Sequence, residues 1–334
     1  MNLRDVLAKS STPLIIGHQN ADPDAVCSML AFRSLYLMTN PEGEPTLVCA
    51  DVSRLSKKVL SLFESTVEIK EFSEKSHDLI VLLDANSRLQ LGSEVGTLLR
   101  EPSQTLVIDH HEENPNIGSI AEHTIINTNV SSTCEIVFNL FRNLDLGIDA
   151  LTANLLLTGM IFDTRRFFYS NKDSLESALE LIELGADYQA CVNSLIIRPD
   201  RSERIARLKA AGRLNVHTFD DWIIATTKVK AFEASACRGL IDLGADVAIV
   251  GGVTANGEVR LSSRSTRDFS TMTGVNLGTD VMEPLGELIG GEGGGHANAA
   301  GANGTRNRDE ALERSIELIR AALEKKRNPM EGGM

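Results

Sequence analysis

Asp109, His110 and His111 stand together directly after the apolar run at residues 105–108, and this cluster is the strongest chemical signal in the chain. Other acid- or histidine-bearing elements also follow apolar runs in the first half of the sequence. They are His18, Asp22 and Asp24 after residues 14–17, Asp84 after residues 79–83, and Asp163 after residues 155–162. Carboxylates gathered in one crevice would repel each other without cations. The residue types therefore predict a dinuclear metal site.

The types of the candidate ligands restrict the choice of metal ion and of reaction. Histidine and carboxylate ligands without thiolates suit Mn²⁺ or Mg²⁺ better than a structural zinc. Two such ions, ~3.5–4 Å apart, can deprotonate a water molecule and hold both the attacked and the leaving oxygens of a phosphate ester. The expected reaction is hydrolysis of a phosphoester or a phosphoanhydride, and the protein must then hold the phosphate in line.

Each of these elements also has a plainer interpretation. Asp24 could cap a helix, Asp84 could be an ordinary residue between a strand and a turn, and Asp163 could end a helix. His110 and His111 could form a polar pair beside a turn. The occurrence of all four elements after apolar runs favours the metal site over these alternatives.

A second group of residues in the C-terminal half could bind phosphate. Gly293, Gly294 and Gly295 precede His296, and glycine permits a close approach of backbone N–H groups to an anion. Arg264 could bind a phosphate through two parallel hydrogen bonds. We expect these five residues to contact the substrate.

Short apolar runs alternate with helical patterns up to about residue 195, which predicts a mostly parallel sheet flanked by helices. The carboxyl ends of parallel strands meet at one edge of the sheet, so the acid and histidine elements can converge there. Strands are expected at residues 14–17, 46–50, 67–69, 79–83, 105–108 and 124–126, and helices at 25–37, 56–63, 133–144, 148–162 and 174–184.

The second half predicts a smaller α/β domain. Strands are expected at residues 222–228, 247–253 and 259–263, with helices at 232–243 and 308–326 and a hairpin turn at Asn256 and Gly257. A polar helix over residues 199–213 is the predicted connector. The expected domains are residues 1–195, a connector at 196–216, and residues 217–328, with the active site in the cleft between the two domains.

Composition excludes several classes of protein. The net charge of −13 over 334 residues argues against a protein that grips long duplex nucleic acid, which requires Lys and Arg. The five cysteines form no CxxC pair, so we expect reduced, buried thiols rather than disulfides. No apolar stretch reaches ~18 residues and no signal peptide begins the chain, which predicts a cytoplasmic protein without a membrane partner.

The order and spacing of these motifs resemble the DHH phosphoesterase superfamily over nearly the whole chain. Its members include RecJ-like nucleases, nanoRNase/pAp phosphatases and family II inorganic pyrophosphatases. The acid and histidine elements match the motifs of the N-terminal domain in order, and residues 293–296 match the signature of the C-terminal DHH-associated domain. Arg165 and Arg166 stand where small residues are often found in this family.

The resemblance implies a role for each residue. One metal ion would be held by His18, Asp22 and Asp84, and the other by Asp24, Asp84, His110 and Asp163, with Asp84 shared. His111 would face the substrate phosphate as an acid or electrostatic stabiliser, with Asp109 as a ligand or as the residue that orients it. The ions would be two Mn²⁺, with Mg²⁺ or Co²⁺ as alternatives, and a homodimer rests on the resemblance alone.

The expected substrates are short oligonucleotides (nanoRNA) and pAp. Aromatic residues make up 4 % of the chain and show no stripe interleaved with basic residues, which disfavours a groove for a long single strand. The alternatives are a phosphodiesterase for cyclic or linear dinucleotides (c-di-AMP or pApA), a RecJ-like single-strand exonuclease, pyrophosphate hydrolysis, and an inactive scaffold for replication or repair.

Overall fold

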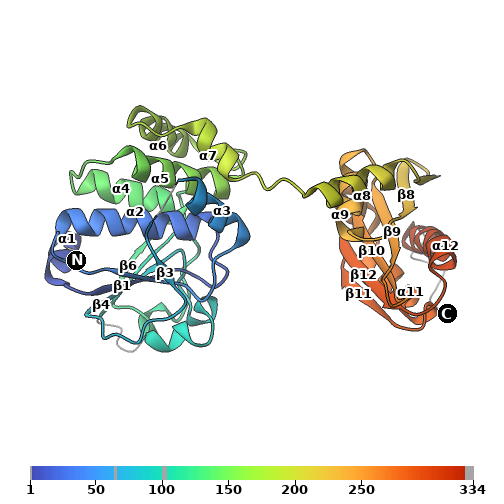
Figure 1. The fold of residues 1–334 in the computed structure, drawn as a ribbon, viewed down its shortest axis with the longest axis horizontal. Helices are drawn as coiled ribbons and strands as arrows, with labels where there is room; N and C mark the ends of the chain where they lie inside the picture. Colours follow the sequence, from blue (N-terminus) through green and yellow to red (C-terminus); the bar gives the residue numbers. More distant parts are fainter. Residues whose placement is uncertain (1, 64–65, 100–103, 328–334) are drawn as a thin grey trace. The chain divides into compact units, whose positions relative to one another are not determined.

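The computed structural model describes residues 2–63, 66–99 and 104–327 and divides into two compact units, residues 1–197 and 198–334 (Figure 1). Residue 328, the predicted end of the second domain, lies outside the described residues. Each unit has its own sheet and its own buried clusters of apolar side chains. The two units are therefore described separately.

The first unit is built on a parallel sheet with the strand order β3-β2-β1-β4-β5-β6, as the sequence predicts. The strand order reverses between β1 and β4, which are neighbours at the centre. In open parallel sheets ligands bind at the carboxyl ends of the strands beside such a reversal. The strands are β1 (Pro13–Ile16), β2 (Thr46–Val48), β3 (Ile69–Lys70), β4 (Leu79–Leu83), β5 (Thr105–Asp109) and β6 (His123–Ile126).

Helices cover one face of this sheet in two layers (Figure 1). Helices α2, α4 and α5 pack together through buried side chains such as Phe32, Phe138 and Met160, and α6 and α7 lie outside them. The helices are α1 (Leu3–Lys9), α2 (Pro23–Thr39), α3 (Arg54–Leu62), α4 (Thr133–Asn143), α5 (Ala150–Asp163), α6 (Lys172–Glu183) and α7 (Tyr188–Ser194).

The other face of the sheet is covered by two 3₁₀ helices, η1 (Arg88–Leu91) and η2 (Val95–Leu98). Leu91 and Val95 pack there against Ile80 and Leu82 of β4. Every residue of β4 is buried. Burial on both faces explains why the apolar runs of the sequence are continuous instead of alternating.

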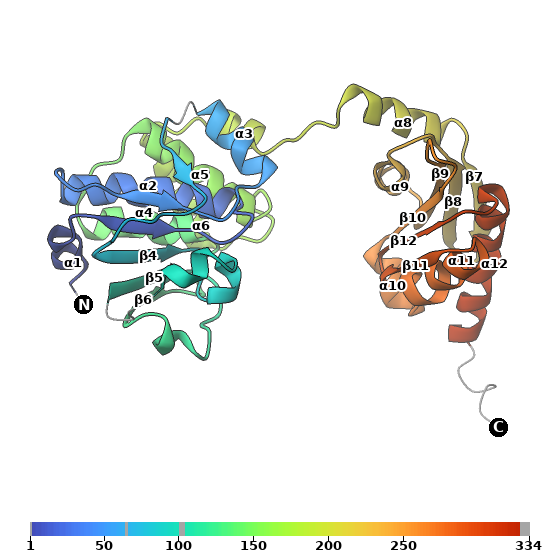
Figure 2. The ribbon, with the colours of Figure 1, turned by 60° about the horizontal axis from the view of Figure 1, so that its bottom comes forward.

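The second unit contains a mixed sheet with the strand order β11-β12-β10-β9-β8-β7, in which β8 and β9 are parallel and the other neighbours antiparallel (Figure 2). The hairpin between β9 and β10 is the predicted one, and Gly257 has a φ of 81° there. The strands are β7 (Asn215–Phe219), β8 (Trp222–Lys228), β9 (Val247–Val253), β10 (Val259–Ser265), β11 (Glu292–His296) and β12 (Ala299–Gly304).

Helices cover both faces of the second sheet. Helix α8 packs on α9 and strand β8 within this unit, and Nε of Arg207 donates a hydrogen bond of 2.7 Å to Oγ of Ser235. The remaining helices pack on the opposite face, around Phe269 and Leu285. The helices are α8 (Arg201–Ala211), α9 (Glu233–Asp242), α10 (Arg267–Thr273), the π-helix η5 (Leu277–Met282), α11 (Glu283–Leu288) and α12 (Arg308–Arg327).

The glycine-rich segment forms two strands, β11 and β12, that sequence patterning does not predict. Strand β11 packs so tightly on η5 and α11 that side chains are excluded. A Cβ atom on Gly293 would lie 1.7 Å from the carbonyl oxygen of Met282, and one on Gly278 would lie 2.4 Å from that of Gly295. Glycine is required here for close backbone packing, which is a tertiary constraint.

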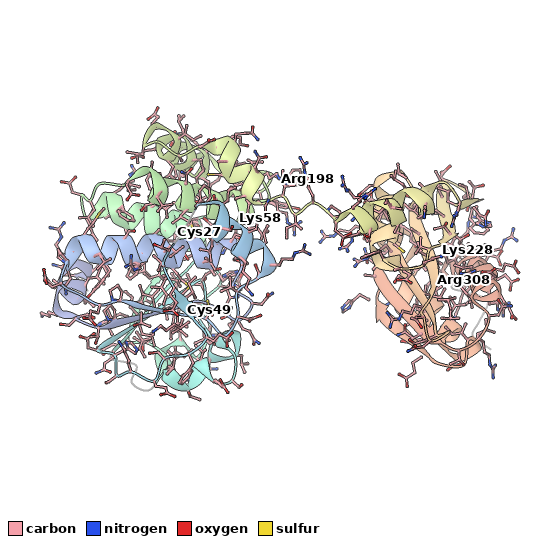
Figure 3. All side chains as sticks on the ribbon, in the orientation of Figure 1. Cys27, Cys49, Lys58, Arg198, Lys228 and Arg308 are labelled. Atoms are coloured by element: carbon pink, nitrogen blue, oxygen red, sulfur yellow. The ribbon has the colours of Figure 1, made fainter. Side chains whose placement is uncertain are left out.

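Three further observations concern the cysteines, the end of the first unit and the apolarity of the helices. All five cysteines are free and buried, as predicted, and Figure 3 shows Cys27 and Cys49 inside the first unit. Lys58 of α3 donates hydrogen bonds to the carbonyl oxygens of Asn193 and Ile196 at 2.7 and 2.6 Å, and so anchors the end of this unit (Figure 3). In the described part of the chain, no helix combines the length and apolarity needed to cross a membrane.

We predict that Gly293→Ala lowers the free energy of unfolding by about 1–3 kcal/mol, because the added methyl group would overlap a backbone carbonyl that cannot rotate away. Chemical denaturation followed by Trp222 fluorescence measures this within the second unit. Gly212→Ala is the matched control, since its Cβ would meet the Leu208 carbonyl oxygen at an ordinary 3.5 Å. Equal midpoints for the two variants would contradict the packing argument.

Candidate metal centre

The acid and histidine residues of the first unit converge where the strand order reverses. His18 follows β1, Asp84 follows β4, and His110 follows β5. Asp84 is 3 % exposed and has a left-handed backbone with a φ of 59°, and its N–H donates to the carbonyl oxygen of Ile108 at 3.1 Å. This conformation is uncommon for a residue with a side chain and is often found at functional sites.

Three groups of candidate ligands include Asp84. In the first group, Nε2 of His18 lies 3.8 Å from Oδ1 of Asp22 and 3.6 Å from Oδ2 of Asp84. The second group is formed by Asp24, Asp84, His110 and Asp163. These are the two sets that the family resemblance implies. A third group joins Asp109 and His111 to Asp84 and His110.

In the second group, the imidazole of His110 lies between two carboxylates. Its Nε2 is 3.6 Å from Oδ1 of Asp84 and 3.0 Å from Oδ2 of Asp163. This nitrogen is buried, yet it makes no hydrogen bond with any of the described residues. A lone pair at this position would be satisfied by a cation between the carboxylates.

A backbone hydrogen bond fixes the tautomer of His18. Its Nδ1 lies 2.8 Å from the carbonyl oxygen of Gln19, which can only accept a hydrogen bond. Nδ1 must therefore carry the proton, and in the neutral ring Nε2 presents its lone pair to Asp22 and Asp84. This is the arrangement that a metal-binding histidine requires.

Asp24 is fully buried and is held by the N-terminus of α4. The N–H groups of Thr133 and Cys134 donate to its two carboxylate oxygens at 2.7 and 3.0 Å. The helix cap that the sequence allows for Asp24 belongs instead to Asp22, whose Oδ1 accepts from the N–H groups of Asp24 and Ala25. Helix α2 consequently begins at Pro23, earlier than predicted.

The hydroxyl of Thr133 connects α4 to the shared ligand. Its Oγ1 donates a hydrogen bond of 2.9 Å to Oδ1 of Asp84. Ser132 in the same turn caps α4 by accepting from the N–H of Glu135. The sequence does not reveal the bond from Thr133 to Asp84, because only the fold brings residues 84 and 133 together.

Asp163 reaches the centre from the end of a helix, not a strand. Helix α5 approaches Asp24 and Cys134 closely because residue 159 is glycine. A Cβ atom there would lie 2.2 Å from Sγ of Cys134 and 2.7 Å from Oδ1 of Asp24. Gly159 is therefore a site-determining residue that the motif analysis did not single out.

Asp109 orients His111. The carboxylate of Asp109 is fully buried, and its Oδ1 accepts from Nδ1 of His111 at 2.9 Å and from the His111 N–H at 3.2 Å. This hydrogen bond raises the pKa of His111 to about 9, with further support from the nearby charges of Asp109, Asp84 and Asp163 against the opposing effect of burial. His111 is therefore protonated at neutral pH, and its side chain is half exposed.

The electrostatics of the centre indicate an excess of buried negative charge. Burial, together with the charges of Asp22 and Asp163, raises the pKa of Asp84 to about 7. Burial and the charges of Asp163 and Asp84 raise the pKa of Asp24 well above its usual value, although two N–H groups stabilise its anion. Divalent cations would remove this repulsion. The donor set fits them, since it consists of carboxylates and imidazoles.

A cavity of about 540 Å³ opens over the centre. Leu89 lies at its rim with 92 % of its surface exposed, and Gln19, Asn20 and Gln90 contribute polar groups. None of these four was predicted as a site residue, because a single leucine or amide in a loop carries no sequence signal. The rest of the lining consists of His18, Asp22, Asp84, His111 and Asp163.

The predicted phosphate-binding residues of the second unit lie in one row across three strands. Arg264 of β10 is opposite Ala299 of β12, and Ala299 is opposite His296 of β11. Directly paired residues of antiparallel strands project to the same face, so Arg264 and His296 flank Ala299 on one face of the sheet. Gly293, Gly294 and Gly295 precede His296 in β11, an edge strand.

Comparison with known proteins decides the family. Residues 13–160 match the model of the DHH family, N-terminal domain, and residues 224–325 match that of the DHHA1 domain. An uncharacterized protein of Methanocaldococcus jannaschii is 32 % identical over 320 residues, which are 96 % of this chain and 94 % of that protein. The chain belongs to the DHH family. Relatives in this family are metal-dependent phosphoesterases, and this DHH protein is an enzyme of that class.

The names of several relatives state an activity, as two examples show. The cyclic-di-AMP phosphodiesterase GdpP of Bacillus subtilis is 26 % identical over 330 residues, which are 93 % of this chain and 48 % of GdpP. The probable bifunctional oligoribonuclease and PAP phosphatase NrnA of Streptococcus mutans is 24 % identical over 217 residues, which are 62 % of this chain and 64 % of that protein. The chain thus spans about half of the first relative and two thirds of the second.

We predict that Thr133→Val lowers the affinity of this DHH protein for divalent metal about tenfold or more, because it leaves an oxygen of the shared Asp84 carboxylate without its donor. Valine keeps the shape of threonine, so the fold should be retained. Titration calorimetry with Mn²⁺ on the metal-free protein measures the change. Thr152→Val removes a buried hydroxyl bonded to Ser34 and serves as the control. Equal affinities for both variants would refute the role of Thr133.

We predict that the metal-free protein loses thermal stability as the pH rises from about 6 to 9. A carboxyl group whose pKa is raised from 3.8 to about 7 in the folded state, that of Asp84, lowers the stability of the fold as the pH rises from the unfolded to the folded pKa, because the unfolded chain has already lost this proton. Histidines whose pKa is raised to about 9, His18 and His111, stabilise the fold below pH 6.5 and lose this effect as the pH rises through 9. Both effects lower the stability of the metal-free protein as the pH rises.

Thermal unfolding followed by circular dichroism in the presence of a chelator tests this slope. Added Mn²⁺ should raise the midpoint more at pH 8 than at pH 6. Asp84→Asn is the comparison variant, since it removes one of the buried charges and should flatten the pH profile. A midpoint of the metal-free protein that rises with pH would contradict the assignment of excess negative charge.

Proposed function

We propose that this protein hydrolyses short oligonucleotides and pAp with two Mn²⁺ ions. The observation that carries the proposal is the sharing of Asp84, whose two carboxylate oxygens each lie 3.6 Å from a different imidazole, that of His18 and that of His110. One ion would be held by His18, Asp22 and Asp84, and the other by Asp24, Asp84, His110 and Asp163.

Divalent cations bound there would lower the pKa of a water molecule and polarise the phosphoryl oxygens of the substrate. The chain's own residues have complementary tasks. His111 is held by Asp109, whose hydrogen bond raises its pKa, and it lines the cavity. We assign to it the stabilisation of charge on the phosphate and the donation of a proton to the leaving oxygen.

The second unit is assigned the capture of the terminal phosphate. Arg264 and His296 lie on one face of the sheet and offer a guanidinium fork and an imidazole to a doubly charged group. The glycines at 293–295 leave space for the backbone to approach it.

The size of the cavity and the net charge of the chain both support the proposal of short substrates. The cavity of about 540 Å³ is of the size that usually binds a small molecule. A net charge of −13 disfavours the binding of a long polyanion, which depends on many Lys and Arg contacts. The similarity to NrnA, whose name states oligoribonuclease and PAP phosphatase activities, supports the same class.

A second candidate substrate is a cyclic or linear dinucleotide. It is favoured by the similarity to GdpP, a cyclic-di-AMP phosphodiesterase, which extends over 93 % of this chain. The chemistry at the metal centre would be the same, and only the shape of the substrate would differ.

We predict that pAp, pApA and a five-nucleotide RNA are hydrolysed in preference to a long single strand, c-di-AMP and pyrophosphate. Each substrate is incubated with the enzyme and Mn²⁺, and the products are separated by chromatography. Asp84→Asn should lower the rate by at least a hundredfold, because it weakens both ion sites at once. Asp173→Asn, an exposed carboxylate on α6, is the matched control and should leave the rate unchanged.

The panel separates the alternatives. A preference for c-di-AMP or pApA over both pAp and the five-nucleotide RNA would replace the first proposal by the second candidate. A preference for the long strand would indicate a RecJ-like exonuclease. Absence of both hydrolysis and bound metal would indicate an inactive scaffold.

A further inference from the structure

The loop that follows Asp163 has an unusual backbone. Arg165, Arg166 and Phe167 have φ values of 49°, 61° and 65°, so three consecutive residues with side chains are in the left-handed region. This region is unfavourable for any residue with a Cβ atom, and it usually occurs at single positions. Such strain persists where the surrounding structure enforces it, and it is concentrated at functional sites.

A set of hydrogen bonds enforces this conformation. Oγ1 of Thr164 accepts from the N–H of Phe167 at 2.9 Å, and the N–H of Arg166 donates to the carbonyl oxygen of Ile161 at 2.8 Å. The N–H of Tyr169 donates to the carbonyl oxygen of Thr164 at 2.9 Å. The last bond folds the loop back onto the end of α5, next to the candidate ligand Asp163.

The folded loop presents aromatic rings to solvent. Phe167 packs against the core, whereas Phe168 is 78 % exposed and Tyr169 is 54 % exposed. The rings of Phe168 and Tyr169 are in edge-to-face contact, with centroids 4.8 Å apart. An exposed ring supported from one side by another ring offers a flat apolar surface to a binding partner.

The loop also carries two arginines. The guanidinium of Arg165 lies 5.3 Å from the centre of the Tyr169 ring. Neither Arg165 nor Arg166 forms an ion pair with a carboxylate among the residues that the structure describes. Guanidinium groups that follow the candidate ligand Asp163 in the chain, in a protein of net charge −13, are suited to attract an anionic substrate.

We propose that this loop binds the nucleoside next to the scissile phosphate. Phe168 stacks on its base, Tyr169 supports Phe168 and is itself held by Arg165, and Arg166 contacts the adjacent phosphate. Rings combined with guanidinium groups recognise unstacked nucleotides, because every base has a flat face and every linkage has a negative charge. The inference rests on the proposed function, since it names the part of the substrate that the loop recognises.

The same rings could instead belong to a protein interface. Helix α6 follows the loop and exposes Leu175, Leu179 and Ile182 along one face. These three side chains are apolar, whereas the loop pairs its rings with cations and follows Asp163, a residue that lines the cavity. The combination favours a nucleotide over a second apolar surface.

Steady-state kinetics with matched substrates test the inference. The substrates are pApA and the same molecule with abasic sugars in place of both bases. Phe168→Ala should raise the KM for pApA about tenfold, as the loss of one stacked base predicts, and leave kcat and the abasic substrate unchanged. Arg166→Gln should raise the KM for both substrates alike. Phe72→Ala, which removes another exposed ring of the first unit, is the control and should leave the KM for both substrates unchanged.

A binding measurement separates this inference from the proposed function. Titration of the Mn²⁺-loaded protein with AMP and with ribose 5-phosphate should show tighter binding of AMP, and Phe168→Ala should abolish the difference. This result would support stacking even if the wild-type protein hydrolysed neither pApA nor pAp. If Phe168→Ala weakened the binding of AMP and of ribose 5-phosphate equally, Phe168 would be assigned to the positioning of Asp163 and the inference would be overturned. A changed sedimentation coefficient with unchanged KM would assign the loop to an interface and overturn it as well.

Discussion

Mutual repulsion among buried carboxylates is the constraint on which the metal centre depends. Asp24, Asp84 and Asp109 are buried at the same end of one sheet, and the charges of Asp24 and Asp84 are costly enough that their pKa values are raised. Burial of like charges is unfavourable unless an opposite charge compensates it. The buried carboxylates therefore lower the stability of the fold, and divalent cations bound among them would restore it. The imidazoles of His18 and His110 complete the two ligand groups proposed for the ions.

The supporting structure reduces this cost without eliminating it. Asp24 lies at the N-terminus of α4, where two N–H groups and the positive end of the helix dipole stabilise an anion. Thr133 donates to Asp84 from the same turn. These donors fix the orientation of both carboxylates before any ion binds. Metal binding therefore has a smaller entropic cost, because these side chains are already ordered. The thermal stability of the first unit and its affinity for metal are consequently linked through the same few hydrogen bonds.

The structure brings together the candidate ligands that the sequence placed at strand ends. His18, Asp84 and His110 follow apolar runs that became β1, β4 and β5, and parallel strands end at one edge. Asp163 was also singled out, but its position depends on a helix that can approach only because residue 159 is glycine. The strands β11 and β12 were not predicted, because glycine disfavours strands locally and is selected here by the packing of η5 and α11. Such contacts join distant parts of the chain and leave no periodic pattern.

The distribution of positive charge around the centre follows from the same constraint. Cations placed among the carboxylates would replace the metal ions, so the basic groups available to a substrate must stand outside the ligand groups. His111 lines the cavity and is held by Asp109, which raises its pKa, and Arg165 and Arg166 follow Asp163 on a loop that folds back onto the end of α5. A left-handed backbone achieves this turn within three residues, which a relaxed loop would do less sharply. The hydrogen bonds that fold the loop back hold this left-handed backbone, so both arginines directly follow a candidate ligand in the chain.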